Sequence, residues 1–288
     1  MNEVWLNGRF LPADAANVPV FDRGFLLGDG VYEIVPVYSR KPFRLDAHLA
    51  RLQHSLQGIR LANPYGIEAW RKIALELAAR QDFADQSLLI QVTRGVPLPG
   101  QPLRDHAFPR DADPTVLIFA QPLVPPAEAQ KAAGVSAITA PDPRWQRCDL
   151  KVISLMANVL MRQRAVEAGC AETIFIRDGL LTEGAASNIF VVQDGTLCTP
   201  APSTHMLTGI TYEVVLELAA RHGIAVRVGE VTEAGLRSAD EIWMTSSTKE
   251  IMPVVMLDEM PVGNGRPGPM ARQMDALYQQ FKQDVMRR

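Results

Sequence analysis

Hydrophobic residues along the chain follow two periodicities, which predict an alternation of short strands and longer helices. Apolar positions that recur every three or four residues predict helices at about 46–59, 66–80, 154–168 and 211–222, and a last helix ends the chain. Short apolar runs bounded by turn residues predict strands between these helices. Asn7-Gly8, flanked by apolar residues, is the clearest of several hairpin signals. The layout is that of an α+β protein.

A proline-rich segment interrupts this pattern once. Pro122, Pro125 and Pro126 lie in the stretch AQPLVPPAEAQKAAG, and such a density of prolines is typical of a connection rather than of a helix or strand. A length of 288 residues is enough for two domains. We therefore predict a small N-terminal α+β domain over residues 1–120, an interdomain linker at 121–130, and a larger C-terminal domain over residues 131–288.

Charge and cysteine content narrow the class of protein. The chain has 29 Lys and Arg against 32 Asp and Glu, a net charge of −3, so we expect no nucleic-acid partner. No apolar run is long enough to predict a membrane span. The three cysteines, Cys148, Cys170 and Cys198, are an odd number at wide spacing, which indicates free thiols. Together with an N-terminus that does not resemble a signal peptide, this predicts a cytoplasmic protein.

Two short motifs match known signatures but lack the context that those signatures need. GNGRPG, with Gly263, Gly265 and Gly268, fits the dinucleotide-binding pattern, yet too few residues follow it to complete a βαβ unit. We interpret it as a turn that leads into the last helix. Ser246 and Lys249 in SSTK have the spacing of a Ser/Lys amidohydrolase, which stays open as an alternative although its companion elements are absent. The histidines are scattered, so we expect no metal site.

One of the six lysines stands out by its surroundings. Four of the others are interpreted as surface residues, in a turn, on polar helix faces or in the linker: Lys41, Lys72, Lys131 and Lys282. Lys151 lies in RCDLKVISLMANVLM, between Leu150 and Val152. An amine among apolar side chains is poorly hydrated in its charged form, which favours the neutral nucleophile that a Schiff base requires. The alternative is a lysine whose stem covers apolar surface while its ammonium reaches water.

Three further features have chemistry that complements such an amine. Glu183, in LLTEGAASNIF, is expected at the end of a strand, where its carboxylate could keep a pyridine nitrogen protonated. Residues 208–211 (TGIT) precede a predicted helix, and the unpaired N–H groups at a helix start favour an anion such as phosphate. Ser246 and Ser247 in the TSST loop could add hydroxyl donors. A lysine, an acid and an anion site in one chain suggest pyridoxal 5′-phosphate as the cofactor.

Six blocks of sequence resemble one family, the fold-type IV pyridoxal-phosphate enzymes, or class IV aminotransferases. The blocks are DRGFLLGDGVYEIVPVY, HLARL, Lys151, LLTEGAASNIFVV, LTGITYEVV and MTSSTKEIMPV, and they extend over nearly the whole chain. The resemblance implies a homodimer. It also implies that each subunit has a small N-terminal α+β domain and a larger, barrel-like C-terminal α/β domain that carries the cofactor lysine.

The resemblance implies roles for individual residues as well. Lys151 corresponds to the Schiff-base lysine, and Glu183 corresponds to the partner of the pyridine nitrogen. The other cofactor-binding residues that it implies are Arg51 for the phosphate, Leu207 behind the ring, and, around the phosphate, Ile210, Thr211, Ser246 and Ser247.

The loop QVTRGVPLPGQPLRDHAFP carries the most specific resemblance. Arg104 and His106 are similar to the R-x-H element of D-amino acid aminotransferases, which binds the substrate carboxylate together with a tyrosine, here Tyr32. This implies a ping-pong transaminase that moves the amino group of a D-amino acid, such as D-alanine, to a 2-oxo acid, such as 2-oxoglutarate. A branched-chain L-amino acid aminotransferase, an R-selective amine transaminase and an aminodeoxychorismate lyase are the alternatives on the same fold.

Overall fold

The computed structural model describes residues 3–287, and the chain forms two compact units. The first unit runs to Val124 and also includes Leu150–Leu155, whereas the second comprises Pro125–Asp149 and continues from Met156. The boundary at Val124 falls inside the predicted linker at 121–130, whereas the segment around Lys151, which was expected in the C-terminal domain, belongs to the first unit. The reason is backbone pairing: Val152 forms a β-bridge with Val31 of the first unit.

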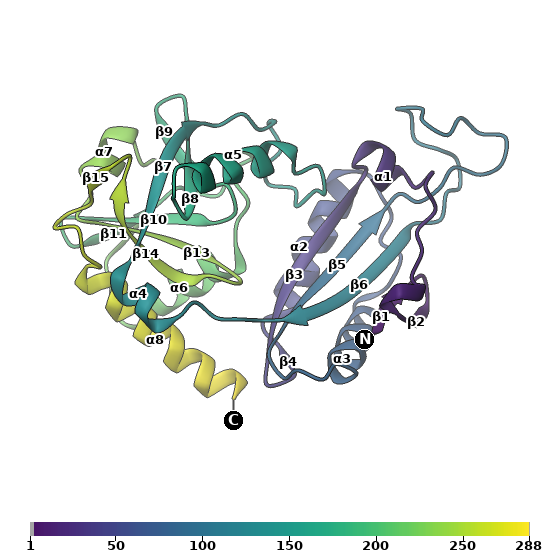
Figure 1. The fold of residues 1–288 in the computed structure, drawn as a ribbon, viewed down its shortest axis with the longest axis horizontal. Helices are drawn as coiled ribbons and strands as arrows, with labels where there is room; N and C mark the ends of the chain where they lie inside the picture. Colours follow the sequence, from purple (N-terminus) through teal and green to yellow (C-terminus); the bar gives the residue numbers. More distant parts are fainter. Residues whose placement is uncertain (1–2, 288) are drawn as a thin grey trace. The chain divides into compact units, whose positions relative to one another are not determined.

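An antiparallel sheet of six strands forms the centre of the first unit (Figure 1). The strand order is β2-β1-β6-β5-β3-β4. The strands are β1 (Glu3–Leu6), β2 (Arg9–Pro12), β3 (Gly30–Tyr38), β4 (Lys41–Pro42), β5 (Gln86–Thr93) and β6 (Thr115–Pro122). The helices are the short η1 (Ala13–Ala15) and α1 (Arg23–Leu27) and the longer α2 (Leu45–Gly58) and α3 (Ile67–Ala79).

Strand alternation explains how α2 and α3 bind to this sheet. Val31, Val35 and Val37 of β3 are fully buried and form one hydrophobic cluster with both helices, to which α2 contributes Leu52 and Leu56. Burying one such side chain stabilises the fold by about 1.5–3 kcal/mol. Glu33 lies on the same face of β3 because side chains alternate along a strand, so a carboxylate is placed in the middle of this apolar row.

The second unit is built on a sheet of nine strands. Eight of them follow the order β12-β11-β10-β13-β14-β7-β8-β9, and β15 pairs with β14. The strands are β7 (Val135–Pro141), β8 (Glu172–Arg177), β9 (Leu180–Gly184), β10 (Asn188–Gln193), β11 (Thr196–Thr199), β12 (Val226–Val228), β13 (Glu241–Ser246), β14 (Glu250–Leu257) and β15 (Met260–Pro261). Strand β9, the last in the order, also contacts β10, so the sheet curls back on itself as a barrel-like domain does.

Five helices accompany this sheet, and they correct two of the lysine predictions. They are α4 (Glu128–Ala133), α5 (Met156–Glu167), α6 (Ile210–Arg221), α7 (Glu233–Arg237) and α8 (Pro269–Met286). Lys131 of α4 and Lys282 of α8 were expected on the surface, but both are buried against Glu250 of β14. Lys131 also contacts Asp275 of α8. The two ammonium groups are tolerated inside because carboxylates neutralise them.

Turn residues account for most of the predicted hairpins. Asn7 and Gly8 have positive φ angles of 46° and 92°, as a tight β-turn between β1 and β2 requires. The GNGRPG segment is a turn before α8, as expected, and the Glu241 carboxylate accepts hydrogen bonds from the N–H groups of Met270 and Ala271 at the start of that helix. Within residues 3–287, no helix combines the length and the apolarity that a bilayer crossing needs.

Candidate active site

Lys151 is held beside β3 by its own backbone. The Tyr32 N–H donates to the Lys151 carbonyl at 2.9 Å, the Ile153 N–H donates to the Gly30 carbonyl at 3.1 Å, and the Lys151 N–H donates to Ser55 Oγ at 3.0 Å. The side chain is half-buried, and its Nζ lies 4.2 Å from the centroid of the Tyr32 ring. The amine therefore faces an aromatic surface that Tyr32, predicted as a substrate-binding residue, supplies.

Arg51, the predicted phosphate ligand, is fixed by a buried carboxylate. Its Nε and Nη2 donate to the two oxygens of Glu33 at 2.7 Å and 2.8 Å, and His48 Nδ1 lies 2.8 Å from Glu33 Oε2. Burial by itself opposes ionisation of Glu33, but the charge and hydrogen bonds of Arg51, together with His48, lower its pKa to about 2. A carboxylate that stays ionised holds the guanidinium in one orientation.

Arg104 and His106 lie in the connection between β5 and β6, and both side chains are exposed. In Figure 1 this connection extends away from the sheet of the first unit. Among the residues described, no hydrogen bond, ion pair or ring contact joins either side chain to Tyr32. The joint role of these three residues at the substrate carboxylate therefore stays a prediction.

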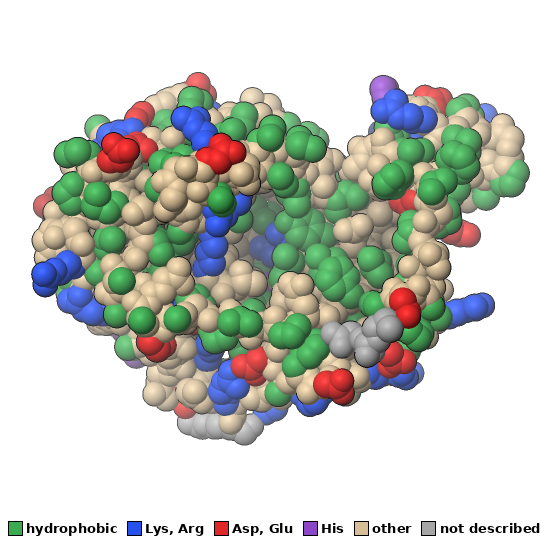
Figure 2. All heavy atoms as spheres, viewed as in Figure 1, with side chains coloured by type: hydrophobic (Ala, Val, Ile, Leu, Met, Phe, Trp, Pro, Cys, Tyr) green, Lys and Arg blue, Asp and Glu red, His purple; other side chains and the backbone are tan. Residues whose placement is uncertain are grey.

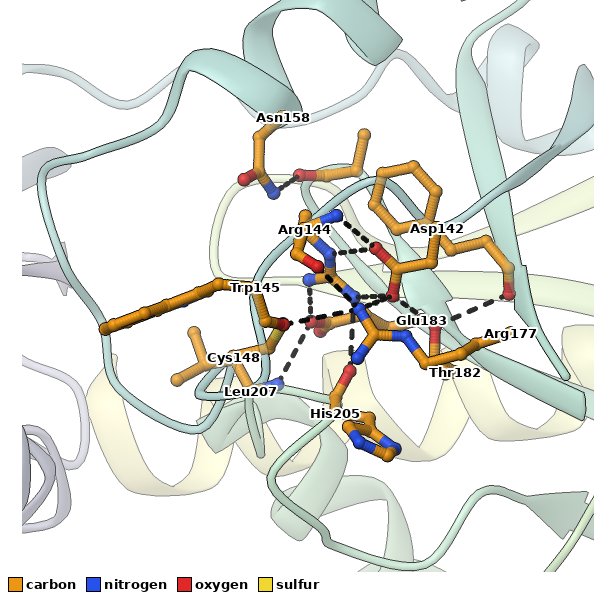
Figure 3. Close-up of polar contacts among 12 residues, drawn as sticks. Asp142, Arg144, Trp145, Cys148, Asn158, Arg177, Thr182, Glu183, His205 and Leu207 are labelled. Carbon is orange, nitrogen blue, oxygen red and sulfur yellow. Dashed lines mark hydrogen bonds and ion pairs between the residues drawn. The ribbon is translucent and has the colours of Figure 1, made fainter.

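In the second unit, Glu183 lies near the end of β9 with only 5% of its surface exposed (Figure 3). Arg144 Nη1 forms an ion pair with Glu183 Oε1, and the Leu207 N–H donates to the same oxygen at 3.1 Å. Asn188 Nδ2 lies 3.3 Å from the other oxygen. Burial raises the pKa of Glu183 to about 7, although Arg144 opposes the rise. This carboxyl can therefore hold or release a proton near neutral pH.

Arg144 is shared between two carboxylates, as Figure 3 shows. Its Nε and Nη2 donate to the two oxygens of Asp142 at 2.9 Å and 2.8 Å, and Nη2 also reaches the His205 carbonyl at 3.1 Å. Arg177 Nη2 lies 3.1 Å from Asp142 Oδ2. Because two hydrogen bonds go to Asp142, only Nη1 of Arg144 remains for Glu183.

Asn188 connects Glu183 to the start of α6. Its Oδ1 accepts from the Gly209 N–H at 3.0 Å, and its Nδ2 donates to the Leu207 carbonyl at 2.8 Å. A side chain at Gly209 would clash, since a Cβ there would lie 2.3 Å from Asn188 Oδ1. Helix α6 begins at Ile210 without a side-chain cap, so its first N–H groups are available to an anion.

The strand register brings the TSST loop to the same place. Asn188 of β10 pairs with Thr245 of β13, directly before Ser246 and Ser247. The predicted Glu183, Leu207, Ile210, Thr211, Ser246 and Ser247 therefore cluster within one unit. The buried Thr245 Oγ1 has no hydrogen-bond partner among the residues described, which leaves one more polar group in this cluster for a ligand.

The geometry does not support the Ser/Lys amidohydrolase alternative. The Lys249 N–H, rather than its amine, donates to Ser246 Oγ at 3.1 Å. The amine itself lies 3.2 Å from Glu172 Oε2, so a carboxylate holds it. A general base must reach the hydroxyl that it activates, and this amine is engaged elsewhere. Within residues 3–287, no group of three His, Cys, Asp or Glu side chains could hold a metal ion.

The sequence patterns did not identify the residues that orient the predicted site residues. Glu33 is one polar position in a strand and gives no signal by itself. Asp142 and Arg144 stand in the irregular segment PDPRWQR, which has no periodicity. Asn188 was visible as the last residue of the E-G-A-A-S-N turn, and an asparagine there could have been expected to bind backbone groups.

Comparison with known proteins shows which family the chain resembles. The sequence matches the family Amino-transferase class IV over residues 30–257. The D-alanine aminotransferase of Bacillus licheniformis is 37% identical over 277 residues, 96% of each chain, and that of Staphylococcus aureus (strain MW2) is 33% identical over 282 residues, 98% of each chain. The solved branched-chain amino acid aminotransferase of Escherichia coli has a TM-score of 0.86 at 26% identity and covers 99% of this chain and 94% of its own.

The fold is therefore shared with a solved aminotransferase over nearly the whole chain, and the sequence with curated aminotransferases over 96% or more of its length. The protein belongs to the class IV aminotransferase family.

Proposed function

We propose that the protein is a D-amino acid aminotransferase, which moves the amino group of a D-amino acid such as D-alanine to a 2-oxo acid such as 2-oxoglutarate. The observation that carries the proposal is the similarity to D-alanine aminotransferases over 96% of both chains. The R-x-H element at Arg104 and His106 supports it, because a guanidinium and an imidazole can together bind a carboxylate.

The residues present fit pyridoxal 5′-phosphate as the cofactor. Lys151 supplies an amine, and Glu183 supplies a carboxyl that holds a proton near neutral pH. The start of α6, the TSST loop and Arg51 supply donors suited to a phosphate. When bound, this cofactor supplies an aldehyde carbon that takes amines and a ring that accepts electrons from the substrate α-carbon.

Each of these side chains has one task in the proposed reaction. Nζ of Lys151 takes a proton from the substrate α-carbon as a general base, and as a general acid it would deliver a proton to the cofactor carbon that bears the nitrogen. Glu183 shares a proton with the ring nitrogen, and Arg144 keeps the carboxyl oriented. Asn188 keeps Glu183 and the start of α6 in a fixed relation through its hydrogen bonds to both.

Tyr32, Arg104 and His106 are proposed to bind the substrate carboxylate. Holding that carboxylate in one place decides which α-hydrogen faces the lysine, and so decides the enantiomer. A branched-chain L-amino acid aminotransferase is the second candidate, which the likeness to the Escherichia coli structure favours. One measurement distinguishes the two candidate functions. For a D-amino acid aminotransferase, D-alanine should change the absorbance of the bound cofactor and L-leucine should not.

We also propose that the enzyme acts as a homodimer. Apolar side chains are exposed on the first unit at Phe21 and Phe25 and on helix α5 at Met156, Val159 and Leu160. Exposed apolar groups of this size are typical of interaction surfaces. Sedimentation at several concentrations would measure the subunit number. The cytoplasmic location stays a prediction.

Replacing the lysine tests the main proposal. Lys151→Ala should abolish both transamination and the visible absorbance of the bound cofactor, because no other amine can take its role. Lys72→Ala removes an exposed lysine of α3 and should leave both unchanged. Full turnover in Lys151→Ala would show that the proposed role of this amine is wrong.

A further inference from the structure

The connection between β5 and β6 is long and runs from Arg94 to Pro114. Connections in compact domains usually have a few residues, and long ones are often functional. Figure 2 shows basic and histidine side chains in the part of the molecule where Figure 1 draws this loop. Arg104 and His106 of the loop are both exposed. An exposed loop can hold two side chains in place only if it is attached firmly to the rest of its unit.

Arg23 of α1 makes the first attachment. Its side chain is almost completely buried, and its Nη1 donates to the Asp105 carbonyl at 2.6 Å. Asp105 is the residue between Arg104 and His106. The Arg23 N–H also donates to the Gly95 carbonyl at 2.9 Å, so one residue contacts both the beginning of the loop and its R-D-H segment.

Phe108 makes the second attachment, two residues after His106. Its ring lies 3.8 Å from the guanidinium carbon of Arg94, with the guanidinium of Arg60 5.6 Å away. Arg94 cannot turn away, because its Nη2 donates to the Ile59 carbonyl at 2.8 Å. A cation held over an aromatic ring attracts it. The segment is therefore attached both at its centre and directly after it.

Asp29 joins the two attachments. Its Oδ2 accepts from Nε of Arg23 and from Nε of Arg94, each at 2.8 Å. Its backbone carbonyl accepts from the Arg94 N–H at 3.1 Å. Asp29 directly precedes β3, the strand that carries Tyr32. One carboxylate thus couples the attachments of the loop to the strand of the proposed tyrosine.

We propose that Arg23 and Arg94, held together by Asp29, are positioning residues that fix the Arg104–His106 segment for recognition of the substrate carboxylate. The proposal rests on the function proposed above, in which Arg104 and His106 bind that carboxylate. Neither Arg23 nor Arg94 touches the substrate in this account. They act by keeping the loop in the one conformation that binds it, and small misplacements of binding groups are costly.

Steady-state kinetics of the holoenzyme test this role with D-alanine and 2-oxoglutarate as substrates. Arg23→Met, which keeps the length of the side chain but removes its donors, should raise KM for both substrates about tenfold or more, while kcat at saturation falls less than about threefold. Phe108→Leu should also raise both KM values. Arg23→Lys should give KM values between those of Arg23→Met and the wild type. The absorbance of the bound cofactor should not change, since no cofactor-binding residue is touched.

A second measurement reports on the loop without catalysis. Trypsin should cleave after Arg104 faster in Arg23→Met and Phe108→Leu than in the wild type, because a released loop is a better substrate. Arg110→Met replaces an exposed arginine of the same loop and should leave both KM values unchanged. If Arg23→Met does not fold, Phe108→Leu tests the positioning role in its place. The Phe108 side chain is 49% exposed, so its replacement removes little of the core.

Arg104→Ala separates the two proposals. If this variant leaves both KM values unchanged, the assignment of the carboxylate site is wrong. If it raises them whereas neither Arg23→Met nor Phe108→Leu does, the carboxylate site stands and the positioning role is wrong.

Discussion

Two buried glutamates, one in each unit, both pair with an arginine, yet their pKa values are shifted in opposite directions. Glu33 is completely buried and Glu183 is 5% exposed, and each contacts an arginine. The pKa of Glu33 is nevertheless lowered to about 2, whereas the pKa of Glu183 is raised to about 7. Burial raises both pKa values, so the difference comes from the partners.

The partners differ in how the arginine is divided. Arg51 donates to both oxygens of Glu33, and His48 adds a third contact. Arg144 gives two of its donors to Asp142 and only one to Glu183. Two carboxylates that share a cation are each stabilised less than one carboxylate that has the cation to itself.

This difference separates the tasks of the two acids. An acid that stays ionised at every physiological pH can serve only to orient Arg51. An acid with a pKa close to 7 can share a proton with a ring nitrogen, which the proposed reaction requires. How much of a guanidinium each carboxylate receives therefore decides whether the acid fixes a neighbour or handles a proton.

The largest expected effect is on Glu33. Glu33→Gln removes the buried carboxylate that pairs with both Nε and Nη2 of Arg51, so the free energy of unfolding of the cofactor-free protein should fall by about 3–5 kcal/mol. Urea unfolding at pH 7 measures this free energy. Glu68→Gln breaks an exposed pair with Arg71 in the same unit and should cost less than about 1 kcal/mol. Equal losses in the two variants would mean that burial adds nothing to the Glu33 pair.

The sequence predicted most of the fold because its signals are local. Asn7-Gly8 and the other turn residues marked hairpins, and the spacing of Leu49, Leu52 and Leu56 marked α2. The motif around Glu183 marked the acid and the loop beside it, and the structure brings those residues together. These features depend on residues that are neighbours in the sequence.

The features that were missed depend on residues that are far apart. Glu33 resembles a solvent-facing position in a strand until α2 brings His48 and Arg51 over it. Lys131 and Lys282 resemble surface residues, since nothing near them in the sequence shows that both reach Glu250. Buried charges are paired through the tertiary fold, and periodicity describes only where apolar side chains go.

Glu183 should make the stability of the protein depend on pH. The folded-state pKa of Glu183 lies above its ordinary 4.5, at about 7, so the folded state binds this proton more tightly than the unfolded state does. Its contribution to stability is therefore complete below pH 4.5 and is lost as the pH rises through 7. The stability difference between the cofactor-free wild type and Glu183→Gln should fall by about 3 kcal/mol between these pH values.

Glu33 should behave differently from Glu183 over the same range of pH. Its pKa is lowered to about 2, so its contribution is already complete at pH 4.5 and is lost only in stronger acid. The difference between wild type and Glu33→Gln should therefore be flat from pH 4.5 to 7. Parallel curves for the two variants would contradict the claim that the two acids differ.

The smallest expected effect isolates the sharing of Arg144. Asp142→Asn removes the competing carboxylate, so Arg144 can pair more fully with Glu183 and the pKa of Glu183 should fall by about one unit, or about 1.4 kcal/mol. The double-mutant cycle with Glu183→Gln isolates the part of the stability that depends on Glu183. Between pH 4.5 and 7 this part should decrease less in the Asp142→Asn background than in the wild type, by that amount. Asp178→Asn, on the exposed β8–β9 turn where asparagine tolerates the positive φ of 52°, serves as the control. If the dependence of stability on pH is unchanged in Asp142→Asn, burial alone sets the pKa of Glu183. The way in which an arginine divides its donors would then explain only the low pKa of Glu33.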